Sequence, residues 1–178
     1  MSEEETMTSR VFPSMLLVAA IGLWSAVGAT ARAEEVSPAA LAAAMNSASA
    51  TLQGGLSASE AQGTPVSAKF EIEDGKLQLS IYTMKGSDFM EIVADPRTGA
   101  VSKAEKITDA DDLKEAAAQK AAIAQAKVPL LTAAEKAVNE NAGSRAVSIV
   151  PELKNGQATA EVTLLTGDAF KKVTEKLD

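Results

Sequence analysis

The chain of 178 residues is long enough for one ordinary domain or two very small ones. It contains no cysteine and no histidine, which excludes thiol chemistry, histidine-based triads and metal sites built on Cys or His. The formal net charge of −7 argues against general nucleic-acid binding, because phosphate neutralisation needs clustered Lys and Arg. Aromatic residues make up 3% of the chain, so stacking platforms for bases or sugars are scarce.

An uncharged apolar segment near the beginning of the sequence indicates an export signal. It runs through residues 11–31 and leads into Ala31-Arg32-Ala33, whose small residues fit the A-x-A pattern of a secretory cleavage site. We therefore predict that residues 1–33 form a signal peptide and that the mature protein begins at Glu34. The expected location is the periplasm or the cell exterior, with no membrane contact after cleavage.

Two alternatives concern this segment. The first six residues are more acidic than the positive start of a signal peptide, so a true start at Met7 is the alternative to a start at Met1. The apolar run is also long enough to span a bilayer, so an uncleaved membrane anchor is the alternative to cleavage.

A repeat with a spacing of 81 residues organises the remaining sequence. Residues 66–93 align with residues 147–174 without a gap, and apolar positions, glycines and turns match. The identical pairs are Val66/Val147, Ser67/Ser148, Glu71/Glu152, Gly75/Gly156, Gly86/Gly167 and Phe89/Phe170.

Both copies contain a dipeptide that favours a two-residue hairpin turn. Asp74-Gly75 in the first copy matches Asn155-Gly156 in the second, and both pairs tolerate positive φ. Alternating apolar residues flank each turn and predict half-buried antiparallel strands. In the second copy Pro151 replaces Phe70, which favours an edge strand or a bulge at that position.

A third strand is expected after each hairpin. In the first copy it covers residues 89–95, with Met90 and Ile92 facing the core. In the second copy, residues 168–178 allow either a strand or a helix capped by Asp168; the repeat favours the strand. Met84 and Met90 are expected to lie in the core or at its edge rather than to form a metal-binding pair.

Helices are predicted before each copy and between the two. The first covers residues 37–52, with Ser37 as N-cap and Pro38 at the first helical position, and loosens into the Gly-rich residues 53–64. A connecting helix lies within residues 108–129. The third begins with a capping box of Thr132 and Glu135 and ends near Gly143.

The loop "DPRTG" after the third strand has the composition of a turn. Pro96 presets φ, Gly99 allows positive φ, and Asp95 can accept backbone N–H bonds. Asp95, Thr98, Gly99 and the strand residue Val101 also stand where the PepSY domain family has its D-x-x-T-G pattern and short final strand, so the region resembles that family. A recognition role of Arg97 is the alternative to a plain turn.

The PepSY resemblance implies an α+β fold related in shape to cystatins, with a helix packed on a small antiparallel sheet. It predicts a first unit at residues 36–107, the connecting helix at 108–129 and a second, shortened unit at 130–178. The second unit departs from the family pattern, because it has neither D-x-x-T-G nor the last strand.

No catalytic, cofactor-binding or metal-binding residue is expected. The sequence has no nucleophile elbow, P-loop or dinucleotide-binding motif. Acidic residues cluster at 71–74 and 109–112, without the spacing of a calcium loop. The first cluster is expected to point outward from a strand and the second to begin a helix, so both are predicted to be solvated structural carboxylates.

The PepSY resemblance implies that the protein is a non-catalytic module that binds another protein. PepSY modules occur in propeptides of thermolysin-like metallopeptidases and in exported bacterial proteins, where they are thought to bind or restrain peptidases or to serve as sensory or protective modules outside the cytoplasm. The partner would thus be a peptidase or another envelope protein. The alternative is an envelope structural or stress protein that associates with itself through strand edges.

Overall fold

The computed structural model describes residues 36–178, so the predicted signal peptide lies outside the described residues. In this range the protein is α+β, with one seven-stranded antiparallel sheet and four helices. In chain order the elements are α1 (Pro38–Met45), α2 (Leu52–Ser59), β1 (Thr64–Glu73), β2 (Lys76–Lys85), β3 (Asp88–Ala94), β4 (Val101–Lys106), α3 (Ala110–Ile123), α4 (Leu130–Glu140), β5 (Arg145–Lys154), β6 (Gln157–Thr166) and β7 (Ala169–Lys176).

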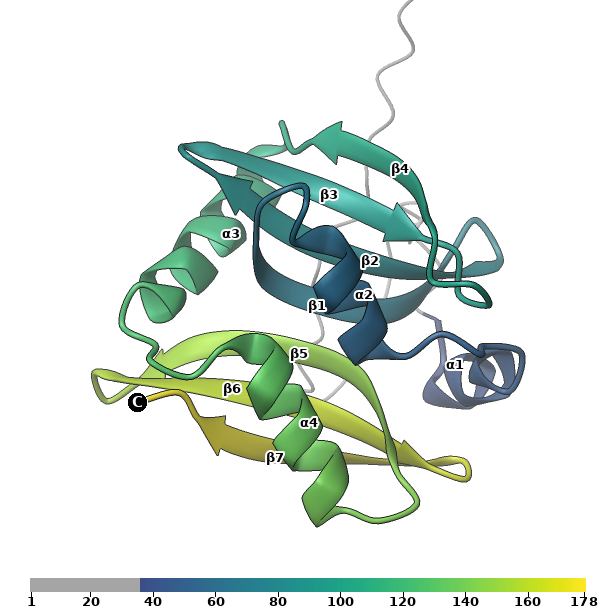
Figure 1. Cartoon of the computed structure of the whole chain (residues 1–178). Coiled ribbons are helices and arrows are strands. Elements are labelled where there is room, and N and C mark those ends of the chain that lie inside the picture. The colour runs from purple at the N-terminus through teal and green to yellow at the C-terminus, as the bar shows by residue number, and fades with distance from the viewer. Residues whose placement is uncertain (1–35) are drawn as a thin grey trace, which may run out of the picture.

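The strands are ordered β4-β3-β2-β1-β5-β6-β7 across the sheet. Helices α2 and α4 cover the same face, one over each half of the sheet (Figure 1). The main core lies between these helices and the apolar positions of the strands, among them Leu56, Leu79, Ile81, Ile149 and Val162. Burial of these side chains is the largest stabilising contribution available to a chain without disulfides.

The 81-residue repeat is visible in the structure. Strands β5 and β6 begin and end 81 residues after β1 and β2. An irregularity in pairing between Pro65 and Ser67 recurs between Ala146 and Ser148. Residues 168–178 contain strand β7, so the preference for a strand in that segment is confirmed.

Both predicted dipeptides form the hairpin turns between consecutive strands. The φ angles are 50° and 72° at Asp74 and Gly75, and 53° and 79° at Asn155 and Gly156. Two successive residues with positive φ define the turn whose twist matches that of the flanking strands.

Replacing Gly75 or Gly156 by Val is expected to destabilise the protein by about 1–3 kcal/mol, because a β-branched residue is strained at positive φ. Space is not the cause, since a Cβ at either glycine would meet no atom within 4 Å. Thermal melts of the two variants measure the effect. Melting temperatures equal to that of the parent protein would contradict the turn assignment.

The predicted helix over residues 37–52 is in fact two helices. Ser37 caps α1 as expected and accepts a hydrogen bond from the amide of Ala40. However, α1 ends at Met45, and α2 occupies the Gly-rich stretch that was expected to be loose. Thr51 caps α2 by accepting from the amide of Gly54 at 3.0 Å. Packing on the sheet overrides the low helix propensity of this segment.

The predicted capping box of α4 is wrong. The helix begins at Leu130 after Pro129, with no side-chain cap, so Thr132 and Glu135 lie inside it. Pro129 has extended φ and ψ, and its ring fixes φ at the point where the helix starts.

The expectation that Pro151 marks an edge strand or a bulge is also wrong. Strand β5 lies inside the sheet between β1 and β6, and Pro151 is opposite Ala160 without a bulge. The proline is tolerated because β1 and β5 pair only at Ala68–Ile149 and Lys69–Ser148. The ladder with β1 ends before Pro151, so no amide is required there.

Helix α3 packs against the other face of the sheet. Side chains of successive strand residues point to opposite faces of the sheet. Ile81 points into the main core, so the side chain of Tyr82 points to the face that α3 covers. A second, smaller core forms where Leu113 and Ala116 of α3 meet Tyr82 and Phe89.

Candidate functional site

The loop after β3 has the geometry of a closed turn. The Asp95 Oδ1 atom accepts hydrogen bonds from the amides of Arg97 at 2.9 Å and Thr98 at 2.8 Å, and from the Thr98 hydroxyl at 3.0 Å. These bonds, the Thr98 amide first, lower the pKa of Asp95 because they stabilise the carboxylate. Gly99 follows with φ 74°. The Arg97 side chain is exposed.

This loop also holds the segment between α1 and α2. The carbonyl oxygen of Pro96 accepts from the amides of Ser49 at 3.1 Å and Ala50 at 3.0 Å. The turn therefore supports the packing of the N-terminal segment, a contact that the sequence pattern did not reveal.

Substituting Asp95 by Ala is expected to lower the melting temperature, because the turn loses the acceptor of three hydrogen bonds. Arg97→Ala should leave the melting temperature unchanged, since its side chain is exposed. Differential scanning calorimetry of both variants checks this pair. A loss of stability in Arg97→Ala equal to that in Asp95→Ala would contradict it.

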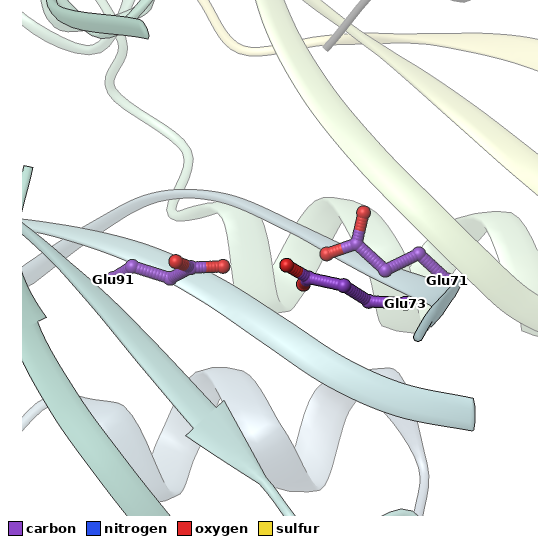
Figure 2. Close-up of side chains that lie close together, drawn as sticks. All are labelled: Glu71, Glu73 and Glu91. Carbon is purple, nitrogen blue, oxygen red and sulfur yellow. The ribbon is translucent and has the colours of Figure 1, made fainter. Parts of the chain in front are cut away.

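Three glutamates converge on the sheet face opposite α2 and α4. Glu71 and Glu73 come from β1 and Glu91 from β3, and Figure 2 shows their carboxylates directed toward one another. One carboxylate oxygen of each lies within 4.8 Å of the others, and all three residues are half-buried. We call this group the acidic cluster.

The acidic cluster is bridged by polar neighbours from the strands. The Gln78 Nε2 atom donates to Glu73 at 2.6 Å, to Glu71 at 3.3 Å and to the hydroxyl of Ser80 at 3.0 Å. Lys69 forms an ion pair with Glu71 at 2.5 Å. Glu71 and Glu73 are therefore partly enclosed, which corrects the expectation that they are solvated.

Glu91 completes the cluster and was not singled out by the sequence. The Tyr82 hydroxyl donates to its Oε1 atom at 3.4 Å. Burial raises the pKa of Glu91, and the nearby charge of Glu71 adds to this. Burial also raises the pKa of Tyr82 well above its usual range. The available signal was alternation, which places Glu91 on the face opposite Ile92.

Helix α3 adds further carboxylates beside Lys69. Burial raises the pKa of both Asp112 and Glu115, and Lys69 opposes the effect at each. Asp109 accepts from the amides of Asp111 and Asp112, so the acids at 109–112 begin a helix as expected. Near the buried end of this face, the Ser67 hydroxyl donates to the Gln119 Oε1 atom at 2.8 Å.

The acidic cluster can bind a proton or a hard cation, since carboxylate oxygens are the ligands that Ca²⁺ and Mg²⁺ prefer. The Gln78 amide and the Lys69 ammonium group already bind carboxylate oxygens of Glu73 and Glu71. Tyr82 is half-buried and donates to Glu91, so it does not serve as a free nucleophile. Burial and the charge of Glu71 favour the protonated form of Glu91.

The acidic cluster is expected to make the protein more stable at about pH 5 than at about pH 8. A raised pKa means that the folded state binds more protons than the unfolded state in this window, so stability falls as pH rises. Glu91→Gln should flatten this dependence and raise stability at neutral pH. Urea unfolding across the pH range measures it.

Glu135→Gln is the control for that series, because Glu135 is exposed on α4 away from the cluster. It should retain the pH dependence of the parent protein. A parent protein that gains stability between the two pH values as pH rises would contradict the role of the cluster.

A groove lies apart from both features. It has a volume of about 660 Å³ and runs along the ends of α2, β1 and β2 and the segment between α3 and α4. Its lining includes Leu56, Gly63, Met84, Ile123 and Val128. The lining also includes the charged residues Glu60, Lys85 and Lys127.

The residues predicted at turns do not form one site. Asp74, Gly75, Asn155 and Gly156 form two separate hairpin turns, while Asp95, Thr98 and Gly99 form the loop that leads to β4. Met84 packs in the smaller core and Met90 against the main core, so both are core residues as predicted.

Comparisons with known proteins identify no family. No protein family matches the sequence, and no curated protein matches it. Among solved structures, a "putative lipoprotein" from Clostridium difficile 630 is 16% identical, with a TM-score of 0.36. The match covers 64% of this chain and 75% of the other. Within residues 36–178 no helix has the length and apolarity needed to cross a membrane.

Proposed function

We propose that the protein is an exported, non-catalytic module that binds another protein, built from two PepSY-like units at residues 36–107 and 130–178. Its partner is a peptidase that it restrains or an envelope protein that it regulates. The D-x-x-T-G loop and the hairpins of the 81-residue repeat support the family assignment.

The observation that carries the proposal is the pair of strands at the ends of the sheet. β4 and β7 are each paired on one side only within the described residues. All six residues of β4 are exposed, so the strand is held mainly by backbone bonds to β3. An edge of this kind accepts an extended segment of another protein by strand addition.

The chemistry of the acidic cluster supports a non-catalytic role. General acid–base catalysis needs a carboxyl group within reach of a substrate atom. Here the Gln78 amide and Lys69 engage Glu71 and Glu73, and Tyr82 engages Glu91. The same edges that serve binding also permit self-association, which is the second candidate function.

Affinity capture from the exported protein fraction tests the proposal. The expected result is one foreign protein recovered in stoichiometric amount with the mature chain. Light scattering over a concentration series is measured in parallel. An oligomer that grows with concentration and recovers no foreign protein would contradict the proposal and favour self-association.

Sequencing of the N-terminus of the cellular protein tests export. A mature chain beginning at Glu34 is expected. An intact Met1 or Met7 on a membrane-bound chain would show that the apolar segment is an anchor.

A further inference from the structure

The two repeats meet in the sheet as if they were two copies related by a two-fold axis. Ala68 of β1 lies opposite Ile149 of β5, which is the residue 81 positions later in the chain. In an antiparallel pair, a residue that faces its own equivalent lies at a two-fold axis. β2 and β3 on one side therefore correspond to β6 and β7 on the other.

The correspondence fails at the outer edges of the sheet. β4 lies outside β3 and pairs with it between Met90 and Ala94. No strand within residues 36–178 pairs with the outer edge of β7, the counterpart of β3. The positions of β7 that correspond to the paired part of β3 are residues 171–175.

Within residues 36–178 no strand pairs with the backbone groups that β7 presents at this edge. The amide of Leu177 donates to the Ala158 carbonyl of β6 at 2.9 Å, so odd-numbered residues bond with β6. Because bonding alternates along an antiparallel strand, even-numbered residues such as Lys172 and Thr174 face outward. The first repeat shows the same parity, since Phe89, the equivalent of Phe170, accepts from the Ile107 amide at 3.0 Å.

The first repeat also shows what an added strand needs. Every residue of β4 is exposed, so its attachment to β3 requires little side-chain burial. One ion pair accompanies it, between Lys106 of β4 and Asp88 of β3 at 2.8 Å. Backbone pairing, complementary charge and the burial of Ile107 directly after β4 hold the strand in this position.

The charge of β7 is opposite to that of β3. β3 carries Asp88 and Glu91 and no base, whereas β7 carries three lysines. The only acid of β7, Glu175, is buried and pairs with Lys136 of α4, which also pairs with Glu140. The three lysines of β7 are exposed: Lys171, which donates to Asn141; Lys172, which pairs with Glu161; and Lys176.

We propose that the outer edge of β7 binds an extended acidic segment of a partner protein as an added antiparallel strand, in the position that β4 occupies beside β3. The inference rests on the proposed binding function and gives it a surface and a partner chemistry. A second copy fits less well, because pairing β7 with β7 of another copy brings lysines close to lysines.

A synthetic peptide of about ten alternating Glu and Val residues, labelled with a fluorophore, is the probe. It is titrated into the chain that begins at Glu34, which contains every described element. We expect saturable binding that weakens at least about tenfold in Thr174→Pro. This variant removes an outward amide without touching the ladder to β6. The double variant Lys172→Glu/Lys176→Glu should also weaken binding, because it replaces two positive charges of β7 by negative ones.

Ala104→Pro is the matched control on the other edge. Glu105 pairs with Glu91 and Lys103 with Val93, so Ala104 faces outward from β4 by the same alternation. Ala104→Pro should bind the peptide within about twofold of the parent protein. Circular dichroism and thermal melts confirm that both proline variants are folded.

Several outcomes would overturn the inference. These are no saturable binding to the parent protein, undiminished binding to folded Thr174→Pro, or equal loss in Ala104→Pro. A dimer that Thr174→Pro abolishes would assign the edge to a second copy. A captured partner that Thr174→Pro still retains would leave the proposed function standing and refute the edge. Peptide binding at β7 without any captured partner would support the edge and refute the proposed function.

Discussion

Arg145→Met is expected to lower the free energy of unfolding by about 3 kcal/mol, because three carbonyl groups lose their hydrogen bonds to a charged donor at once. The Arg145 guanidinium donates to the carbonyl oxygens of Met45 at 3.0 Å, Ala48 at 3.1 Å and Ala50 at 3.1 Å. It also lies 5.9 Å from the ring centre of Phe70. One side chain at the start of β5 therefore holds the segment between α1 and α2.

Methionine keeps the length of the side chain and removes its charge and donors. Arg97→Met makes the same change at an exposed position and should leave stability unchanged. Urea unfolding of both variants gives the comparison. A loss below about 0.5 kcal/mol in Arg145→Met would show that the three hydrogen bonds do not stabilise the fold.

Gly55→Val should destabilise the protein by about 3 kcal/mol, because the helix lies too close to the sheet for a larger side chain. A Cβ at Gly55 would lie 2.5 Å from Leu79 Cδ2 and 3.2 Å from Leu79 Cγ. Leu79 is fully buried, so it has no free space into which it can move. The glycine sets the distance between α2 and the sheet.

Ser57→Val is the matched control, since it introduces the same side chain at an exposed position of the same helix. It should change the free energy of unfolding by less than about 0.5 kcal/mol. Equal melting temperatures for Gly55→Val and the parent protein would contradict the close approach.

The hairpins were predictable because their signals are local. Asp74-Gly75 and Asn155-Gly156 favour one turn type, and alternation on either side fixes which residues face the core. Repetition at 81 residues also resolved the choice between strand and helix at the end of the sequence. Local chemistry and internal repetition therefore determined the strands.

Helix α2 could not be predicted, because its stability comes from packing. Gly54 and Gly55 lower intrinsic helix propensity, yet the absence of a side chain at Gly55 permits contact with Leu79. The predicted start of α4 was also wrong. Thr132 and Glu135 match a capping pattern, but both residues lie inside the helix.

The acidic cluster was only half predictable. Glu71 and Glu73 share a strand face by alternation, but Glu91 joins them through the pairing of β1 with β2 and of β2 with β3. The pairing of Ala68 with Ile149 likewise depends on how the two repeats meet. Such contacts between distant segments leave no periodic signal in the sequence.

Amide hydrogen exchange of the complex with the captured partner tests the central claim most directly. The claim is that the outer edge of β7, rather than β4, the acidic cluster or the Asp95 loop, is the binding surface. We predict that binding slows exchange at Lys172, Thr174 and Lys176 and leaves Ala104 unchanged. Slowed exchange confined to residues 71–73 or 95–99, with β7 unaffected, would contradict the claim.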